Sequence, residues 1–352
     1  MSPNLRKYFS KLTTSPLLNS VLIAQLLTGN YCGISDSRLV CFILRVYCIV
    51  LVFLLSFFHF YNYSNQLLVT NVILEYVFHA LFYFVTAQEY IFKYYHAIKT
   101  CDTIMGLKNI PFLSLRTVAG LLILLFNSNL TLWSISNLSI EFFPTFMLFM
   151  ILDFNHYMGS IHYAPILIRV KLLRKSLEDN LVPVNIVGRD EVNRNVIRIK
   201  KSLNYYSNLM DTLPYCNKEL QCSVNDRVYF YLISEYNLYA EQSFCFSYSL
   251  RYFLIYQNGF TPSIQMYWHL YKDEVDEIKS ILASQLARCS DMSIRIELET
   301  TLQYINLRPL NFSILNIIDI DIKLLFTTIG ITITYVIIAL QLTHFSQKPE
   351  SR

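Results

Sequence analysis

Charge is scarce in this sequence of 352 residues. Charged residues make up 15% of it and hydrophobic residues 54%, whereas soluble domains carry about 25% charged residues. So few charges cannot cover the water-exposed surface of a chain this long, which excludes an ordinary soluble enzyme, a disordered chain and a secreted disulfide scaffold. The composition predicts a polytopic integral membrane protein.

Glycine and catalytic motifs are scarce as well. Only eight glycines occur, and the sequence has no glycine-rich phosphate loop, GxSxG element or HExxH element. None of the eight cysteines forms a CxxC pair, and His156 and His162 are too far apart to place a metal on one helix face. We therefore expect no catalytic residues, no metal site and no cofactor, and a chain that is not an enzyme. The net charge of +4 does not indicate a nucleic-acid partner.

Long apolar segments dominate what is present. A bilayer core requires about 20 mostly apolar residues per helix. This length predicts spans at Val40–Tyr61, Leu67–Phe92, Val118–Ser136, within Phe142–Val170, and from Leu324 to Leu342. The aromatic-rich segment Val228–Tyr271 is interrupted by charged residues, so it holds either two short spans or one long one.

The basic residues sort by side of the membrane. Lys and Arg gather in residues 1–39, in the loop after the second span and in residues 171–227, but the loops after spans one and three have none. The positive-inside rule then predicts a cytosolic N-terminus. Three glycosylation sequons fall at the predicted outer ends of spans, and we expect glycosylation at Asn62, Asn129 and Asn137.

Helical periodicity continues outside the spans. Leu17–Leu27 predicts an uncleaved, partly amphipathic cytosolic helix, and Val192–Leu209 has an apolar stripe opposite a basic face. A similar stripe in the segment 272–322 comprises Ile278, Ile281, Leu282 and Leu286. We expect these helices to pack together below the membrane, with helices lying on the membrane surface as the alternative.

Ionisable side chains within the spans need partners, because burying them in lipid is costly. Glu75 and His79 are i,i+4 neighbours on the second span, and Asp153 and His156 are i,i+3 neighbours on the fourth. These pairs indicate either a polar pocket open to the outside or interhelical hydrogen bonds that fix the bundle. Trp133 is either a pocket wall or a residue of the interfacial aromatic belt.

The last span carries a polar stripe. It reads Thr334-Tyr335-Val336-Ile337-Ile338-Ala339-Leu340-Gln341-Leu342, and the seven-residue spacing places Thr334 and Gln341 on one helical face. A Gln deep in an apolar run must face protein or water. The stripe therefore indicates either a helix–helix contact or a pore wall.

This run resembles the signature that closes insect gustatory receptors, namely Thr-Tyr, five hydrophobic residues and Gln-Phe, with Leu342 in place of the Phe. The preceding stretch is similar too, from Ile296-Glu-Leu-Glu through Phe312-Ser-Ile-Leu to Ile318-Asp-Ile-Asp. The specific part of the resemblance covers residues 270–345, and the rest of the chain matches in layout.

The resemblance implies an all-α bundle of seven transmembrane helices with a cytosolic N-terminus and an extracellular C-terminus, unrelated to G-protein-coupled receptors. The implied organisation is a cytosolic segment at 1–39, spans one to four at 40–170, a cytosolic helical extension at 171–227, spans five and six at 228–271, a cytosolic anchor at 272–322, the pore helix at 323–343 and an extracellular tail at 344–352.

The resemblance also implies a function, that of a taste receptor acting as a tetrameric ligand-gated cation channel. The implied pore residues are Thr334, Tyr335, Ile338, Gln341 and Leu342, with Ile338 or Leu342 as a hydrophobic constriction. The implied ligand pocket lies between spans two, three, four and six, with candidate residues Glu75, His79, Trp133, Asp153 and His156.

The implied partners are a small-molecule tastant, in particular an apolar or bitter one, permeating monovalent and divalent cations, membrane lipid, and other gustatory receptors in a homo- or heterotetramer. The implied location is the plasma membrane of sensory neurons, over dendrite, axon and cell body. A non-channel polytopic receptor or transporter is the alternative, as is a divergent non-functional family member. If Val228–Tyr271 forms a single span, the C-terminus lies inside and the last helix is inverted.

Overall fold

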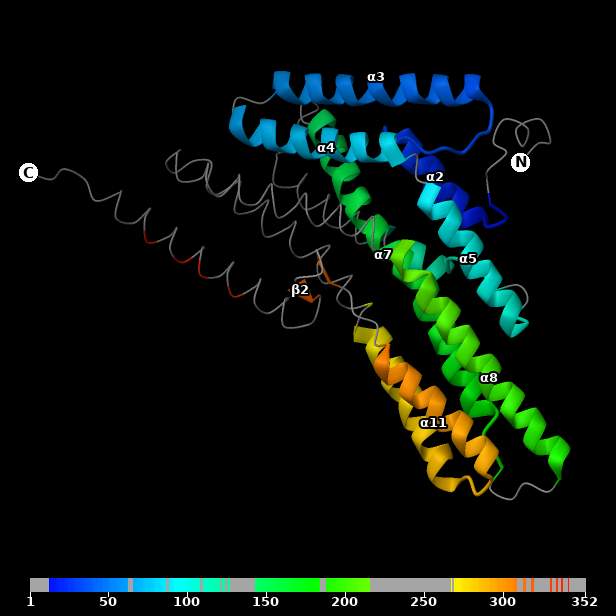
Figure 1. Cartoon of the computed structure of the whole chain (residues 1–352). Coiled ribbons are helices and arrows are strands. Elements are labelled where there is room, and N and C mark those ends of the chain that lie inside the picture. Colours follow the sequence, from blue (N-terminus) through cyan, green and yellow to red (C-terminus); the bar gives the residue numbers. More distant parts are fainter. Residues whose placement is uncertain are drawn as a thin grey trace, which may run out of the picture.

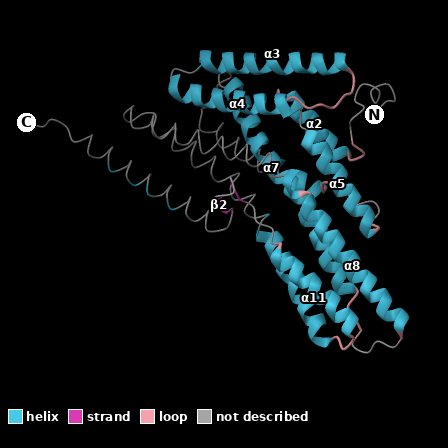
Figure 2. Ribbon diagram, viewed as in Figure 1, coloured by secondary structure: helices cyan, strands magenta, loops and turns pink. Residues whose placement is uncertain are grey.

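The protein is helical through most of the chain that the structure covers (Figures 1 and 2). The computed structural model describes residues 13–62, 66–86, 89–107, 110–120, 122–123, 126, 143–183, 188–215, 267, 269–308, 313–314, 318–319, 330, 334, 337 and 341. Its main helices are α2 (Pro16–Leu27), α3 (Arg38–Asn62), α4 (Gln66–Thr86), α5 (Glu89–Met105), α7 (Phe143–Asp179), α8 (Arg189–Asp211), a helix over 269–288, and α11 (Met292–Leu307). Residues 115–120 and 213–215 are helical as well. The predicted all-α class is confirmed.

Helices α3, α4 and α7 pack against one another, and α7 continues away from them as a 37-residue helix (Figure 1). Tyr76 of α4 packs with Leu148, Ile151 and Leu152 of α7, and all four side chains are buried. The far half of α7 contacts α8, which also contacts α5 and α11. The molecule therefore has two parts, which α7 joins. The first, called the helical sheaf below, consists of the apolar helices α3, α4 and the first half of α7. The second, called the bundle, consists of the amphipathic helices α8, the helix over 269–288 and α11 with the second half of α7.

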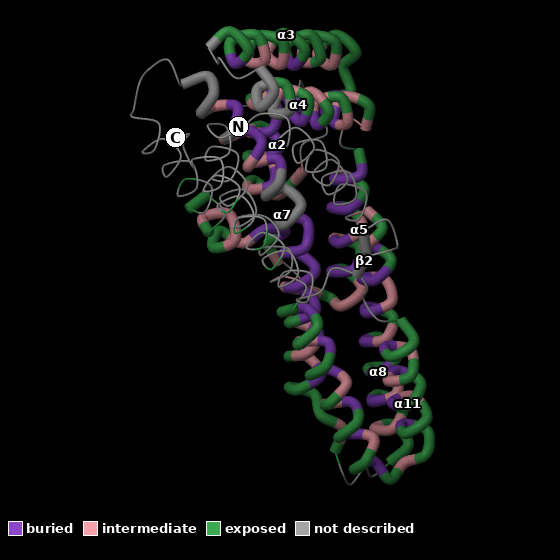
Figure 3. The backbone as a smooth tube through the Cα atoms, turned by 90° about the vertical axis from the view of Figure 1, so that its left-hand side faces the viewer, coloured by how far each residue is buried: buried purple, intermediate pink, exposed green. Residues whose placement is uncertain are grey.

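Helix α3 turns most of its surface outward (Figure 3). Among the described residues, one helix, Arg38–Tyr61, is long and apolar enough to cross a membrane. Large apolar side chains stand exposed along it, including Phe42, Phe53, Phe57 and Phe60. An exposed apolar surface of this extent is typical of a face that contacts a membrane or another protein.

The predicted helices of the bundle are present where the apolar periodicity placed them. Helix α8 contains the whole of Val192–Leu209, and its stripe buries Ile199 and Tyr206. The helix over 269–288 buries Ile278 and Leu282 and half-buries Ile281 and Leu286. Both stripes contribute to the same hydrophobic core, so the expected packing of these segments is confirmed.

Two local expectations are wrong. Residues 313–314 and 318–319, within the segment expected to be helical, pair as antiparallel strands β1 (Ser313–Ile314) and β2 (Ile318–Asp319). The sequence there is rich in isoleucine, whose branched Cβ restricts χ1 in a helix and suits a strand. Helix α2 is also less amphipathic than expected, because Gln25 is fully buried beside Leu22 and Leu26.

The two ends of α2 explain how this helix docks. Ser15 caps its N-terminus by accepting a hydrogen bond from Leu18 N, and Pro16 occupies the first turn, where its missing N–H costs nothing. At the other end Gly29 has φ +88°, and Asn30 N donates to Gln25 O. This C-terminal turn requires a left-handed residue. It presents the carbonyl of Thr28 to the hydroxyl of Tyr76, which donates to it at 2.9 Å.

We expect Gly29→Ala to lower the melting temperature of the detergent-purified chain more than Gly106→Ala does. Both glycines have positive φ, which costs an alanine about 1–2 kcal/mol. Only at Gly29 would the new Cβ also lie 2.7 Å from the Tyr76 hydroxyl, whereas nothing lies within 4 Å at Gly106. Equal shifts for the two variants would contradict close docking of this turn on α4.

Candidate functional site

The predicted pocket residues of the second span lie in the interior of the helical sheaf. Glu75 and His79 of α4 are 5% and 2% exposed. Tyr76 beside them packs on α7, and the ring of His79 lies nearly parallel to that of Tyr83, with 6.4 Å between centroids. The i,i+4 spacing therefore places a carboxylate and an imidazole together on the buried face of α4, as the sequence predicted.

The structure describes the other predicted pocket residues only in part. Asp153 is half-buried on α7, and His156 lies on the same helix with its side chain outside the described set. Trp133 lies outside the described residues. Because α4 and α7 are in contact, the structure brings together the two helices that carry the Glu75/His79 and Asp153/His156 pairs.

A buried amide pair that sequence reasoning missed lies between α2 and α7. Asn30 and Asn155 are almost fully buried, and Asn30 Nδ2 donates to Asn155 Oδ1 at 2.6 Å. Asn30 Oδ1 and Asn155 Nδ2, both buried, have no hydrogen-bond partner among the described residues. A water molecule or a small polar ligand bridging these two atoms would satisfy both. Two features of the sequence could have indicated this pair: Gly29-Asn30, which is typical of the end of a helix, and Asn155, which lies between the polar residues Asp153 and His156.

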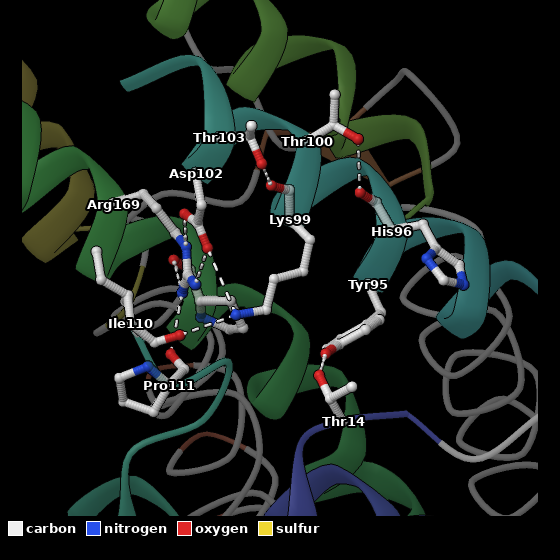
Figure 4. Close-up of polar contacts among 11 residues, drawn as sticks. Thr14, Tyr95, His96, Lys99, Thr100, Asp102, Thr103, Ile110, Pro111 and Arg169 are labelled. Carbon is white, nitrogen blue, oxygen red and sulfur yellow. Dashed lines mark hydrogen bonds and ion pairs between the residues drawn. The ribbon is translucent and has the colours of Figure 1, made fainter. Parts of the chain in front are cut away.

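The strongest polar cluster joins α5, α7 and the segment after α5 (Figure 4). Arg169 of α7 has no exposed surface, and its guanidinium binds Asp102 of α5 in a bidentate manner, with Nε to Oδ1 at 3.0 Å and Nη2 to Oδ2 at 2.9 Å. Its Nη1 donates to the carbonyl oxygens of Pro165 and Pro111. The sequence analysis did not single out Arg169 or its partner, since Asp102 is 67 residues away in the chain.

Lys99 completes this cluster from the solvent side. Its Nζ donates to Ile110 O at 3.0 Å and lies 3.9 Å from Asp102 Oδ2, and about a third of its side chain is exposed. One carboxylate therefore faces two cations. Three hydrogen bonds from Arg169, to Asp102 and to Pro111 O, and one from Lys99 hold α7, α5 and residues 110–111 in one arrangement. The chemistry is structural, because these bonds are all made to the protein itself.

Neutral side chains surround the cluster. Burial, reinforced by the Asp102 carboxylate, raises the pKa of the Cys101 thiol to about 11. Burial and the same carboxylate raise the pKa of the fully buried Tyr205 of α8 well above its ordinary value. Both groups are therefore protonated at neutral pH, and Cys101 acts as a small packing residue, consistent with the sequence interpretation of the cysteines.

Further ion pairs hold the bundle together at its surface. Arg174 of α7 binds Glu274 at 2.6 Å and Glu277 at 3.0 Å, both on the helix over 269–288, and the hydrogen bond with Glu274 raises its pKa. Lys200 of α8 pairs with Glu297 of α11 at 3.1 Å, and Arg308 with Asp211. Arg174 and Lys200 of the segment 171–227 thus have acidic partners in the 272–322 segment, and Arg308 pairs in the opposite direction, which the sequence did not reveal.

Four described residues of the last predicted span are helical and exposed, namely Gly330, Thr334, Ile337 and Gln341. Their spacing of four, three and four places them within about 60° of one another around a helix. Thr334 Oγ1 donates to Gly330 O at 2.9 Å, so its hydroxyl is satisfied within its own helix. Thr334 and Gln341 were predicted pore residues, Ile337 was not, and Tyr335, Ile338 and Leu342 lie outside the described residues.

The predicted glycosylation sites are only partly visible. Asn62 is the last residue of α3, which is the outer end of span one in the predicted topology. Asn129 and Asn137 lie outside the described residues. Within the described part of the chain, no group of three or more His, Cys, Asp or Glu side chains could hold a metal ion.

Comparison with known proteins adds no relative. No protein-family model matches the chain, and no curated protein matches it significantly.

We expect Arg169→Met to destabilise the chain by roughly 3–5 kcal/mol, because it leaves the Asp102 carboxylate buried without its main partner. The double variant Arg169→Met/Asp102→Leu should recover most of this loss, since apolar groups can replace a buried ion pair. Thermal unfolding in detergent measures both. Lys93→Gln, which breaks the exposed Lys93–Glu89 pair, is the control and should cost at most about 0.5 kcal/mol. A double variant no better than Arg169→Met would contradict this account.

Proposed function

We propose that this chain is a subunit of a gustatory-type taste receptor that acts as a ligand-gated non-selective cation channel in the plasma membrane of sensory neurons. The proposed subunit has seven spans, with a cytosolic N-terminus, an extracellular C-terminus and four subunits around a central pore. The end of α7 beyond residue 170, α8, the helix over 269–288 and α11 form the cytosolic part. The ligand is a small apolar or bitter molecule.

The observation that carries the channel proposal is the exposed face of the last span. Gly330, Thr334, Ile337 and Gln341 point away from the chain's own core, and a Gln on such a helix must meet protein or water. The same run carries the gustatory-receptor resemblance. Four copies around an axis would direct this face at a water-filled path, where Gln341 offers polar contact to hydrated ions.

Helix α3 supports the membrane part of the proposal. It is 24 residues long over its apolar stretch, enough for a bilayer core of about 30 Å at 1.5 Å per residue. Its exposed phenylalanines would contact lipid. The bundle, by contrast, exposes Lys, Arg, Glu and Asp and uses them in ion pairs, so it suits water.

The proposed ligand site lies around Glu75 and His79, whose helix α4 contacts α7. His79 lies against the ring of Tyr83, and Leu148, Ile151 and Leu152 pack on Tyr76; a mostly apolar pocket with few polar groups favours an apolar ligand over a sugar. In the proposed mechanism a tastant binds the open state more tightly than the closed state and shifts the equilibrium by that difference. Dewetting at Ile338 or Leu342 closes the pore.

A second candidate function is a polytopic receptor or transporter without a pore. Gly330 and Thr334 form a small-xxx-small spacing, which lets two membrane helices approach closely. In this case the exposed face of the last span packs on another helix, and Gln341 forms an interhelical hydrogen bond.

We expect an epitope tag at the C-terminus to be stained on intact cells that express the full chain. Seven spans from a cytosolic N-terminus place the C-terminus outside, and they require two spans within residues 228–271. An N-terminal tag on the same chain is the control and should stain only after permeabilisation. If the C-terminal tag also requires permeabilisation, the number of spans is even and the channel proposal fails.

We expect Gln341→Ala to change the relative permeability of the expressed receptor to Na⁺, K⁺ and Ca²⁺, while surface expression stays normal. Removing the amide takes away a polar contact that hydrated ions meet in the pore. Gln303→Ala, at an exposed position of α11, is the matched control and should leave permeability unaltered. Loss of assembly without a change in permeability would instead favour the packing function.

A further inference from the structure

Arg45 is the one described cation on the membrane-facing length of α3 after Arg38, and it is exposed. Residues three before and four after it, Phe42 and Ile49, share its helical face and are 66% and 56% exposed. The next residue, Val46, is apolar and exposed as well, whereas Cys48 on the other side of Arg45 is buried. A permanent charge therefore stands on a surface built for hydrocarbon, where it requires a partner.

Two aromatic rings of the protein stabilise this charge in part. The guanidinium carbon of Arg45 lies 5.0 Å from the ring centroid of Tyr31 and 5.4 Å from that of Phe84. The centroids of the two rings lie 5.9 Å apart and the ring planes are inclined at 52° to each other, so the guanidinium contacts two differently oriented rings. Tyr31 is 2% exposed and precedes α3, and Phe84 belongs to α4.

The Tyr31 hydroxyl also interacts with the Arg45 side chain, but Tyr31 and Phe84 leave most of the N–H donors of the guanidinium unused. A cation–π contact uses the ring faces to stabilise the charge, at about 0.5–1 kcal/mol in exposed positions, whereas a guanidinium carries five N–H donors in its own plane. Among the described residues, no carboxylate forms an ion pair with Arg45. A planar donor fork of this kind matches the oxygens of a phosphate group.

The position of Arg45 along α3 puts this fork within reach of lipid headgroups. It lies seven residues after Arg38, which is about 10 Å along the helix axis. Side chains on a helix lean toward its N-terminus, and a long Arg side chain reaches back from this depth to the interface. In the proposed topology that interface is the cytosolic one, where anionic phospholipids concentrate.

We propose that Arg45, held over Tyr31 and Phe84, binds the phosphate of an anionic phospholipid of the inner leaflet. This inference rests on the membrane topology of the proposed function and does not depend on the pore. The lipid would neutralise the charge at this point of the helical sheaf. Because Tyr31 and Phe84 come from different elements, the bound lipid would also bridge the segment before α3 to α4.

Native mass spectrometry of the full chain in a non-ionic detergent tests the proposal, with phosphatidylserine as the probe. We expect the wild-type chain to retain phosphatidylserine in preference to a galactosyl diacylglycerol, which has no phosphate. Arg45→Gln should weaken phosphatidylserine binding about tenfold, through loss of charge-assisted hydrogen bonds, and Phe84→Leu about threefold. Arg45→Lys keeps the charge without the planar fork and should lie between wild type and Arg45→Gln.

Arg194→Gln is the matched control, because Arg194 is exposed on α8 in the bundle, and it should leave phosphatidylserine binding unchanged. Three results would overturn the lipid site: undiminished binding by Arg45→Gln, equal retention of the galactolipid, or displacement of the lipid by millimolar inorganic phosphate, which would indicate a site for the free anion.

The same preparations keep this test separate from that of the proposed function. An Arg45→Gln chain that inserts with wild-type tag accessibility but retains the lipid overturns only the lipid site. A wild-type chain that does not fractionate as an integral membrane protein overturns both proposals.

Discussion

A charge that is shut off from water must be neutralised by the chain itself, and in this protein that constraint falls on Arg169. Its guanidinium has no exposed surface, and it meets Asp102 on α5 and the carbonyl oxygens of Pro165 and Pro111. The N–H donors of the Arg169 guanidinium lie in one plane, so binding the Asp102 carboxylate fixes both the distance between α5 and α7 and their relative orientation. Helix α8 then packs on α5 and α7, and α11 packs on α8.

This junction separates two environments within one chain. On one side α3 exposes phenylalanine and isoleucine, and polar atoms such as the amides of Asn30 and Asn155 are buried between helices. On the other side Arg174 and Lys200 pair with acids on neighbouring helices. In the proposed receptor, the ligand site lies in the first part and the subunit anchor in the second.

Periodicity accounts for the parts of the fold that were predicted from the sequence. Helix α8 and the helix over 269–288 have apolar stripes at helical spacing, and these stripes are buried. The paired positions of Glu75 and His79 were predictable for the same reason, because i,i+4 neighbours share a face. The strands β1 and β2 were not predicted, since each has only two residues, too few for a period to be recognised. The burial of Gln25 was not predicted, since it depends on the elements that pack on α2.

The sequence by itself determined the helical class, the apolar character of α3 and the faces that the bundle helices bury, because each follows from composition and spacing within one segment. Only the tertiary structure decided which segments meet. Asp102 and Arg169 are 67 residues apart, Asn30 and Asn155 are 125 apart, and Arg174 and Glu274 are 100 apart. The rings of Tyr31 and Phe84 likewise meet over Arg45 only through packing. Such pairings depend on how helices dock in three dimensions, which no local pattern of residues encodes.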